Sequence, residues 1–233
     1  MNNDNETIAA RVSSEFGDKV SRIKSNFSEL AYDVSKDNLT DVATALRENN
    51  LFSFEQLIDL CGVDYLTFGS EEWITNSATE SGFSRGVDRK AVILDDADQF
   101  DSKRFCVIYH LLSITNNSRI RLRVYTGTDN PPHIDSVTNI WNSANWFERE
   151  AFDLFGIIFD GHPDLRRILT DYGFIGHPFR KDFPLVGNVE VFYDEDQGKV
   201  VYKKTEIEER TLVPKVIRDD HRYQEKKQGR KND

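Results

Sequence analysis

Apolar and polar residues alternate most regularly in the middle of the chain, where the pattern predicts two strands joined by a turn. Residues 105–114 are apolar on both alternating faces, which is typical of an interior strand. Residues 120–124 alternate Ile, Leu and Val with Arg, as a strand with one exposed face does. The polar run at residues 115–118 predicts the turn between them. Residues 20–35 are expected to contribute further strands.

Apolar residues at helical spacing predict helices in the first third of the chain. One helix is expected to begin near Thr40. A second is predicted over residues 54–60. Ser53 and Gln56 match the spacing of a capping box in front of it, and Gly62 is suited to end it.

Helical periodicity returns in the second half of the chain. A helix is expected to lead into residues 148–187, on the spacing of Ile134, Val137, Trp141 and Ala144. The next helix is predicted to start at Asn145, with Glu148 as its capping-box partner, and to end at Gly156. Pro163 is predicted to open a short helix through Leu169.

These elements indicate an α+β fold, with a mixed or antiparallel sheet and packed helices, followed by a long extended C-terminal arm. The predicted domains are an N-terminal segment with a helix and candidate strands at residues 1–37, an α+β domain at 38–187 and a C-terminal region at 188–233. Inside the domain, the polar residues 70–104 are longer than an ordinary connection and predict a surface loop.

The C-terminal region is expected to begin with a hairpin of residues 189–193 and 199–203. The remaining residues have little apolar periodicity and suit an arm laid over a neighbouring protein. The last twenty residues carry seven Lys or Arg and four Asp or Glu. This local positive charge fits either contact with an acidic partner or a solvated tail.

Composition limits the classes of function. The 233 residues are 38% hydrophobic and 30% charged, enough for a core without disulfides, and no apolar stretch is long enough to span a bilayer. The net charge of −10 argues against nucleic acid as a ligand. The acidic amino terminus lacks the layout of a targeting signal, which favours a bacterial cytoplasmic origin.

The chain lacks the usual motifs for redox cofactors and nucleotides. Cys61 and Cys106 are its only cysteines, too few for an iron–sulfur cluster, and we expect them to be buried reduced thiols. Neither a Gly-x-Gly-x-x-Gly nor a phosphate-binding Gly-Lys-Ser/Thr sequence occurs. We therefore expect the chain itself to bind no cofactor.

Charged, aromatic, Gly and Pro residues are concentrated in residues 148–187. Glu150 and Asp153 lie three apart on one face of the predicted helix, where like charges repel unless cations pair with them. The candidate cations are Arg149, Arg166, Arg167, Arg180 and Lys181. Arg166 in particular is expected to hold one carboxylate in a network with Arg167.

The order of residues in this segment closely resembles the signature of the 30-kDa-type subunit, the C subunit, of proton-translocating NADH:quinone oxidoreductase, respiratory complex I. The matching positions are Glu148 to Glu150, Asp153 to Phe155, His162, Arg166, Ile168 to Phe174 and His177 to Leu185. Weaker resemblance at residues 54–65 and 105–113 extends the match over most of residues 38–185.

The resemblance implies a cofactor-free structural subunit of the enzyme's peripheral arm, inactive when isolated. Electrons would pass from NADH through FMN and iron–sulfur clusters to quinone on other chains, coupled to proton translocation. The implied partners are the quinone-site D subunit and the iron–sulfur B subunit, at the cytoplasmic side of the cell inner membrane. No residue is expected to be catalytic or to bind a metal, and the expected interface residues are Glu148, Arg149, Glu150, Asp153, His162, Arg166, Arg167, His177, Arg180 and Asp182.

Two further interpretations remain open. A related membrane-bound hydrogenase has a similar subunit, although the intact residues 167–185 favour complex I. A stand-alone metal-dependent enzyme would use His162 and His177 with a carboxylate such as Glu150 or Asp153. The two histidines lie in separate Gly-His-Pro turns and form no His-x-x-x-His pair, which makes this the weaker hypothesis.

Overall fold

The computed structural model describes residues 2–25, 29–66, 68, 74–75, 87–88, 103–184, 187 and 189–205. It forms two compact units, Met1–Phe183 and Pro184–Asp233. The predicted loop at 70–104 lies largely outside the described residues, and so does the predicted arm after residue 205. Among the described residues, no helix has the length and apolar character needed to cross a bilayer.

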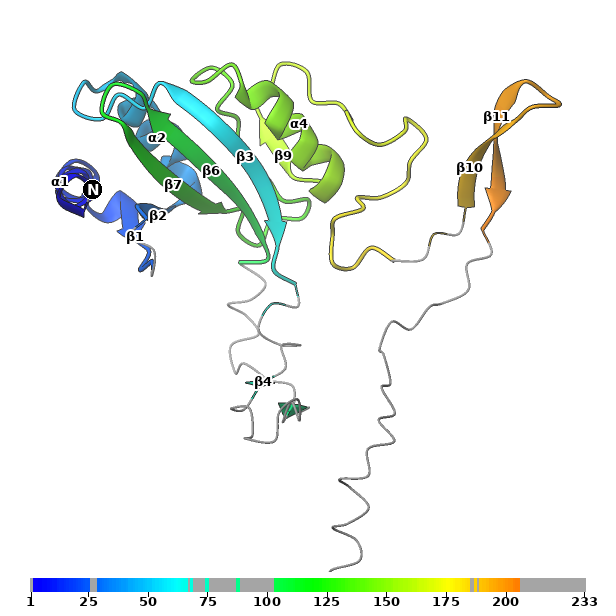
Figure 1. The fold of residues 1–233 in the computed structure, drawn as a ribbon, viewed down its shortest axis with the longest axis horizontal. Coiled ribbons are helices and arrows are strands. Elements are labelled where there is room, and N and C mark those ends of the chain that lie inside the picture. Colours follow the sequence, from blue (N-terminus) through cyan, green and yellow to red (C-terminus); the bar gives the residue numbers. More distant parts are fainter. Residues whose placement is uncertain are drawn as a thin grey trace, which may run out of the picture. The chain divides into compact units, whose positions relative to one another are not determined.

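The first unit contains a mixed sheet of five strands in the order β1-β2-β7-β6-β3 (Figure 1). Its strands are β1 (Val20–Arg22), β2 (Ala31–Val34), β3 (Gln56–Asp64), β6 (Phe105–Ser113) and β7 (Ser118–Tyr125). Strands β2 and β7 pair in parallel, and the other neighbours are antiparallel. Two short strands between β3 and β6, β4 (Ile74–Thr75) and β5 (Val87–Asp88), pair with each other. The predicted strands in the middle of the chain and at residues 20–35 are confirmed.

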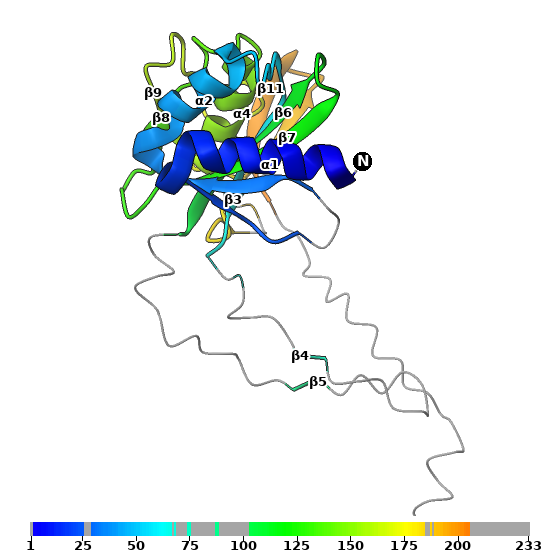
Figure 2. The ribbon, with the colours of Figure 1, turned by 90° about the vertical axis from the view of Figure 1, so that its left-hand side faces the viewer.

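The principal helices are α1 (Asn2–Phe16), α2 (Leu39–Glu48) and α4 (Ala144–Phe155), with short 3-10 helices η1 (Gly17–Lys19) and η2 (Lys36–Asn38). Helix α1 lies at the β1–β2 side of the sheet and α4 beside β3, at the other edge (Figures 1 and 2). Strand β8 (His133–Asp135) precedes α4 and strand β9 (Ile158–Asp160) follows it. The two strands pair in parallel. Gly62 in β3 permits the close approach of α4, since a Cβ there would lie 2.7 Å from the Phe155 ring.

One face of the sheet is buried and the other is half-exposed. In β7, Ile120, Leu122 and Val124 are buried, while Arg121 and Arg123 between them are only partly covered. This is the alternation that the sequence predicts for a strand with one exposed face.

The helix predicted over residues 54–60 is wrong, because residues 56–64 form the edge strand β3. The register slips by one residue between Leu57 and Asp59, at a bulge. Leu57 and Leu60, three apart, consequently both pack on the buried face. Their spacing imitates that of a helix.

Other helix predictions need correction. Ile134, Val137, Trp141 and Ala144 are all buried, but they belong to β8, to turns and to the first residue of α4. Asn145 lies inside α4 and does not cap it; the capping position is Ser143, without a side-chain bond. The predicted end of the helix at Gly156, with φ of 72°, is confirmed. No helix follows Pro163.

The second unit contains the predicted hairpin, formed by β10 (Val189–Asp194) and β11 (Lys199–Lys204). Asp194 closes its turn by accepting hydrogen bonds from the amides of Asp196 and Gln197.

Candidate interaction site

Residues 162–180, which we call the strap, follow β9 and run alongside α4 (Figure 1). The strap contacts the helix in order, first at Asn145, then at Arg149, Asp153 and Phe155. The respective strap partners are His162, Arg166, Leu169 and Arg180. Hydrogen bonds therefore hold the strap to α4 along the length of the helix.

Asp153 is the main anchor of the strap, and its side chain is fully buried. One carboxylate oxygen accepts the backbone amides of residues 168, 169 and 170 at 3.1, 2.7 and 2.8 Å. The other accepts from Arg167 at 3.0 Å and from the Thr170 hydroxyl. Burial alone would raise the pKa of Asp153, but the Thr170 hydroxyl and the three amides hold that pKa well below its usual range. These bonds draw residues 168–170 onto α4 in place of the predicted helix.

The arginine that pairs with Asp153 is Arg167, not Arg166 as the sequence led us to expect. Arg167 also donates to the Thr170 hydroxyl at 3.0 Å and to the carbonyl of Gly176 at 2.9 Å. Arg166 instead pairs with Asp164 at 2.9 Å, and both side chains are more than half exposed. A network of arginine and carboxylate groups is therefore present, but its partly buried arginine is Arg167, one residue after the predicted Arg166.

The two histidines serve as separate anchors. His162 hydrogen-bonds the carbonyl of Asn145 through Nε2 at 3.1 Å and accepts the Asp164 amide at Nδ1. His177 contacts the carbonyl of Asp153 at 2.8 Å, and burial together with nearby arginines lowers its pKa. Their helix contacts are eight residues apart, about 12 Å along α4. The structure does not bring them together, and no His, Cys, Asp and Glu group suited to a metal ion occurs among the described residues.

The last residue of the strap is bonded to α4, and the two residues after it are bonded to the sheet side of the first unit. Arg180 donates to the carbonyl of Phe155 at 2.5 Å, and Asp182 pairs with Arg104 at 2.7 Å. Arg104 also bonds the buried Asp64 at 3.2 Å, and Asp64 accepts the amide of Lys181 at 2.9 Å. No motif in the sequence predicts a role for Arg104, and the only signal for Asp64 is that it falls in the weaker upstream resemblance.

Glu148 and Glu150 have opposite surroundings. Glu148 is buried and joins α4 to the preceding connection, accepting the Ser136 hydroxyl at 2.6 Å and the Val137 amide at 2.8 Å. It is an internal link, not the capping residue that was predicted. Burial raises the pKa of Glu148 to about 7, although both hydrogen bonds act to lower it. Glu150 is exposed, and no described residue hydrogen-bonds or ion-pairs with its side chain.

Ionisation of Glu148 should make the stability of the first unit depend on pH. The folded-state pKa lies above the unfolded value of 4.5. At a pH between these two values the folded protein binds more protons than the unfolded protein, so stability should fall as pH rises from about 5 to 7. The loss is about 3 kcal/mol at full ionisation. Glu148→Gln, which cannot ionise, should flatten this dependence in thermal melts, whereas the exposed Glu150→Gln should not. Parallel pH profiles for wild type and Glu148→Gln would contradict the assignment.

The apolar side chains around the strap are unusually exposed. The Arg167 side chain and the amides of residues 168–170 face α4. Several large apolar residues in contrast are exposed to solvent, namely Trp146, Leu169, Tyr172, Ile175 and Phe179. Tyr172 and Ile175 are 91% and 90% exposed. Large exposed apolar residues grouped on one segment mark interaction surfaces.

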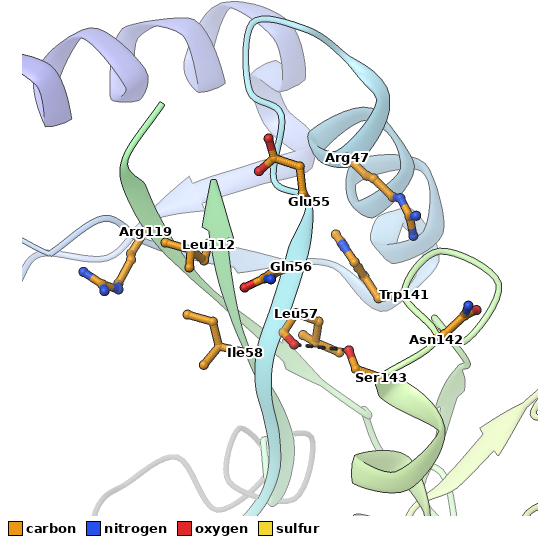
Figure 3. Close-up of a pocket in the computed structure, with 10 residues that line it drawn as sticks. All are labelled: Arg47, Glu55, Gln56, Leu57, Ile58, Leu112, Arg119, Trp141, Asn142 and Ser143. Carbon is orange, nitrogen blue, oxygen red and sulfur yellow. Dashed lines mark hydrogen bonds between the residues drawn. The ribbon is translucent and has the colours of Figure 1, made fainter. Parts of the chain in front are cut away.

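A separate groove of about 700 Å³ surrounds the first residues of β3 (Figure 3). Its lining includes Arg47, Gln56, Trp141 and Asn142, and the Ser143 hydroxyl donates to the carbonyl of Leu57 at 3.2 Å. None of the residues predicted as site residues lines this groove.

Comparison with known proteins assigns the chain to a family. Residues 32–189 match the family described as respiratory-chain NADH dehydrogenase, 30 Kd subunit. The NADH-quinone oxidoreductase C subunit of Halorhodospira halophila is 49% identical over 227 residues, covering 94% of this chain and 92% of the relative. That of Hydrogenovibrio crunogenus is 52% identical over 213 residues, covering 91% and 95%.

A solved structure shares the fold at lower similarity. It is that of a membrane-bound sulfane sulfur reductase, an archaeal respiratory membrane complex, with 19% identity and a TM-score of 0.52 over 84% of this chain and 98% of that one. The sequence relatives decide the family, since both matched chains are covered almost completely. This chain belongs to the family of the 30-kDa subunit of respiratory-chain NADH dehydrogenase.

Proposed function

We propose that the chain is a cofactor-free, non-catalytic subunit of the peripheral arm of NADH:quinone oxidoreductase. The observation that carries the proposal is the strap, which is bonded to the buried Asp153 of α4 by polar groups while its large apolar side chains remain exposed. An arrangement of this kind suits a contact surface more than a reaction site.

The chemistry of the strap supports a non-catalytic role. A general acid or base must reach its substrate and titrate near the working pH. Asp153 is buried, accepts five hydrogen bonds and has a lowered pKa. Glu148 has a suitable pKa of about 7 but is fully buried. Neither carboxylate combines accessibility with the required pKa.

The proposed partners are the quinone-site D subunit and the iron–sulfur B subunit, through which the chain would reach the cytoplasmic side of the inner membrane. FMN and the clusters that carry electrons from NADH to quinone would belong to other chains of the enzyme. Relatives of about 50% identity are named as the C subunit of NADH-quinone oxidoreductase, which favours this enzyme over a hydrogenase.

Purification of the isolated chain and of the whole enzyme tests the proposal. The isolated chain should be colourless, contain no stoichiometric iron or flavin and fail to oxidise NADH. A tag on this chain should recover the detergent-solubilised enzyme with the quinone-site and iron–sulfur subunits in equal amounts. Stoichiometric cofactor in the isolated chain, or recovery of the chain without either partner, would contradict it.

A further inference from the structure

Residues 170–176, which we call the hook, form a closed loop within the strap. Arg167 joins its two ends, since one guanidinium donates to the Thr170 hydroxyl at 3.0 Å and to the carbonyl of Gly176 at 2.9 Å. The same guanidinium lies 5.9 Å from the centre of the Phe174 ring. Because Arg167 is itself held by the buried Asp153, the ends of the hook are fixed to α4.

The middle of the hook is fixed by packing. Phe174 stacks on Phe183 with ring centres 5.8 Å apart and an interplanar angle of 24°. Gly176 has φ of +95°, and a Cβ there would lie 2.9 Å from the Phe183 ring. Only glycine fits this position without strain. One aromatic side chain of the hook therefore points inward, in a defined conformation.

Tyr172 and Ile175 point the other way and are the two most exposed large apolar side chains in the described chain. A mobile loop could turn them inward, but the anchored ends and the Phe174 packing hold them out. We propose that the hook is formed before assembly and inserts Tyr172 and Ile175 into an apolar recess of a different subunit of the same enzyme. This inference rests on the proposed function and names the contact that it would use.

A different protein chain fits the hook better than a lipid bilayer does. Two side chains bury too little apolar area to hold a chain of this size on a membrane. The exposed Asp171 beside Tyr172 would also face the anionic headgroups. A protein recess can enclose both apolar side chains and leave the carboxylate at its rim.

A second copy of this chain is also a poor occupant. The groove around β3 is not a purely apolar recess, because the charged and polar side chains of Arg47, Glu55, Gln56 and Asn142 line it beside apolar ones. Insertion of the hook of one copy into the groove of the next would moreover join two different surfaces. Contacts of this kind build open filaments unless the rotation between successive copies closes a ring. The recess is therefore assigned to another subunit.

Photocrosslinking in the intact enzyme tests the contact. A photoreactive benzophenone side chain is placed at position 172 of the full chain, expressed in cells that assemble the enzyme, and the purified enzyme is irradiated. The control carries the same group in place of Ile114, an exposed residue in the β6–β7 turn. We expect a cross-link from position 172 to one other subunit. A yield no higher than the control, a cross-link between two copies of this chain, or cross-links to lipid only would overturn the proposal.

A competition experiment measures the contribution of the two side chains. Tagged chain carrying Tyr172→Ser and Ile175→Ser is co-expressed with untagged wild type, and the tagged fraction in purified enzyme is determined. Loss of two interface anchors should reduce that fraction at least about tenfold, while tagged Ile114→Ser should compete equally. Equal incorporation of the double variant would contradict the hook. If tagged wild type is itself absent from the enzyme, the proposed function fails; if wild type is incorporated and only the hook results are negative, this inference alone fails.

Discussion

Replacement of Asp153 by alanine should lower the free energy of unfolding by about 3–5 kcal/mol, the largest effect expected of any substitution in α4 or the strap. The change removes the acceptor of five hydrogen bonds and leaves the Arg167 guanidinium without its carboxylate. Denaturant unfolding of the purified chain measures the loss. The exposed Glu150→Ala, three residues earlier on α4, is the matched control and should change stability by less than about 0.5 kcal/mol.

The same carboxylate should show its contribution in acid. Since the folded-state pKa of Asp153 is lowered, its stabilisation is complete above the ordinary pKa of an unfolded aspartate, about 3.9, and is lost as pH falls below that value. The stability difference between wild type and Asp153→Ala should therefore shrink at low pH. A difference that stays constant down to about pH 2.5 would contradict the assignment.

Arg167→Ala should cost about 3 kcal/mol, whereas Arg166→Ala should cost about 0–1 kcal/mol. The reason is geometric, because Arg167 bonds the buried Asp153, Thr170 and Gly176 while Arg166 pairs with an exposed aspartate. Equal losses for the two neighbouring arginines would refute the network.

A double-mutant cycle separates this pairing from general damage to the strap. Asp153→Ala and Arg167→Ala combined should lose about 1–3 kcal/mol less than the sum of the single losses, because each single change already breaks the shared interaction. Additive losses would show that the two side chains act independently.

The strands in the middle of the chain could be predicted from the sequence because their pattern of apolar and polar residues is long and uninterrupted. Strand β3 could not be predicted, because its bulge places Leu57 and Leu60, which have helical spacing, on one face of the strand. The spacing of the buried residues before α4 likewise resembles that of a helix, because successive turns direct their side chains into the core. A short apolar pattern cannot distinguish these cases, because the register and the turns depend on pairing with distant residues.

The candidate site was predicted in composition but not in pairing. The sequence indicated that buried carboxylates and arginines would meet, yet Arg166 and Arg167 are adjacent, and only the path of the strap decides which one faces Asp153. The contact of Asp64 with the amide of Lys181 joins residues 117 apart in sequence, and no local pattern reports it. The exposure of Tyr172 and Ile175 follows from the packing of Phe174 on Phe183, and it could not be predicted from the sequence either.

The central claim, that the chain acts by position and not by chemistry, is tested most directly by measuring enzyme amount and turnover together. Membranes from cells carrying Arg167→Ala would be assayed for assembled enzyme and for NADH:quinone activity, with Arg166→Ala as the control. We expect Arg167→Ala to lower the amount of assembled enzyme several-fold, while turnover per assembled enzyme stays within about twofold of wild type. Normal assembly with strongly reduced turnover per enzyme would contradict the account and indicate a direct part in the reaction.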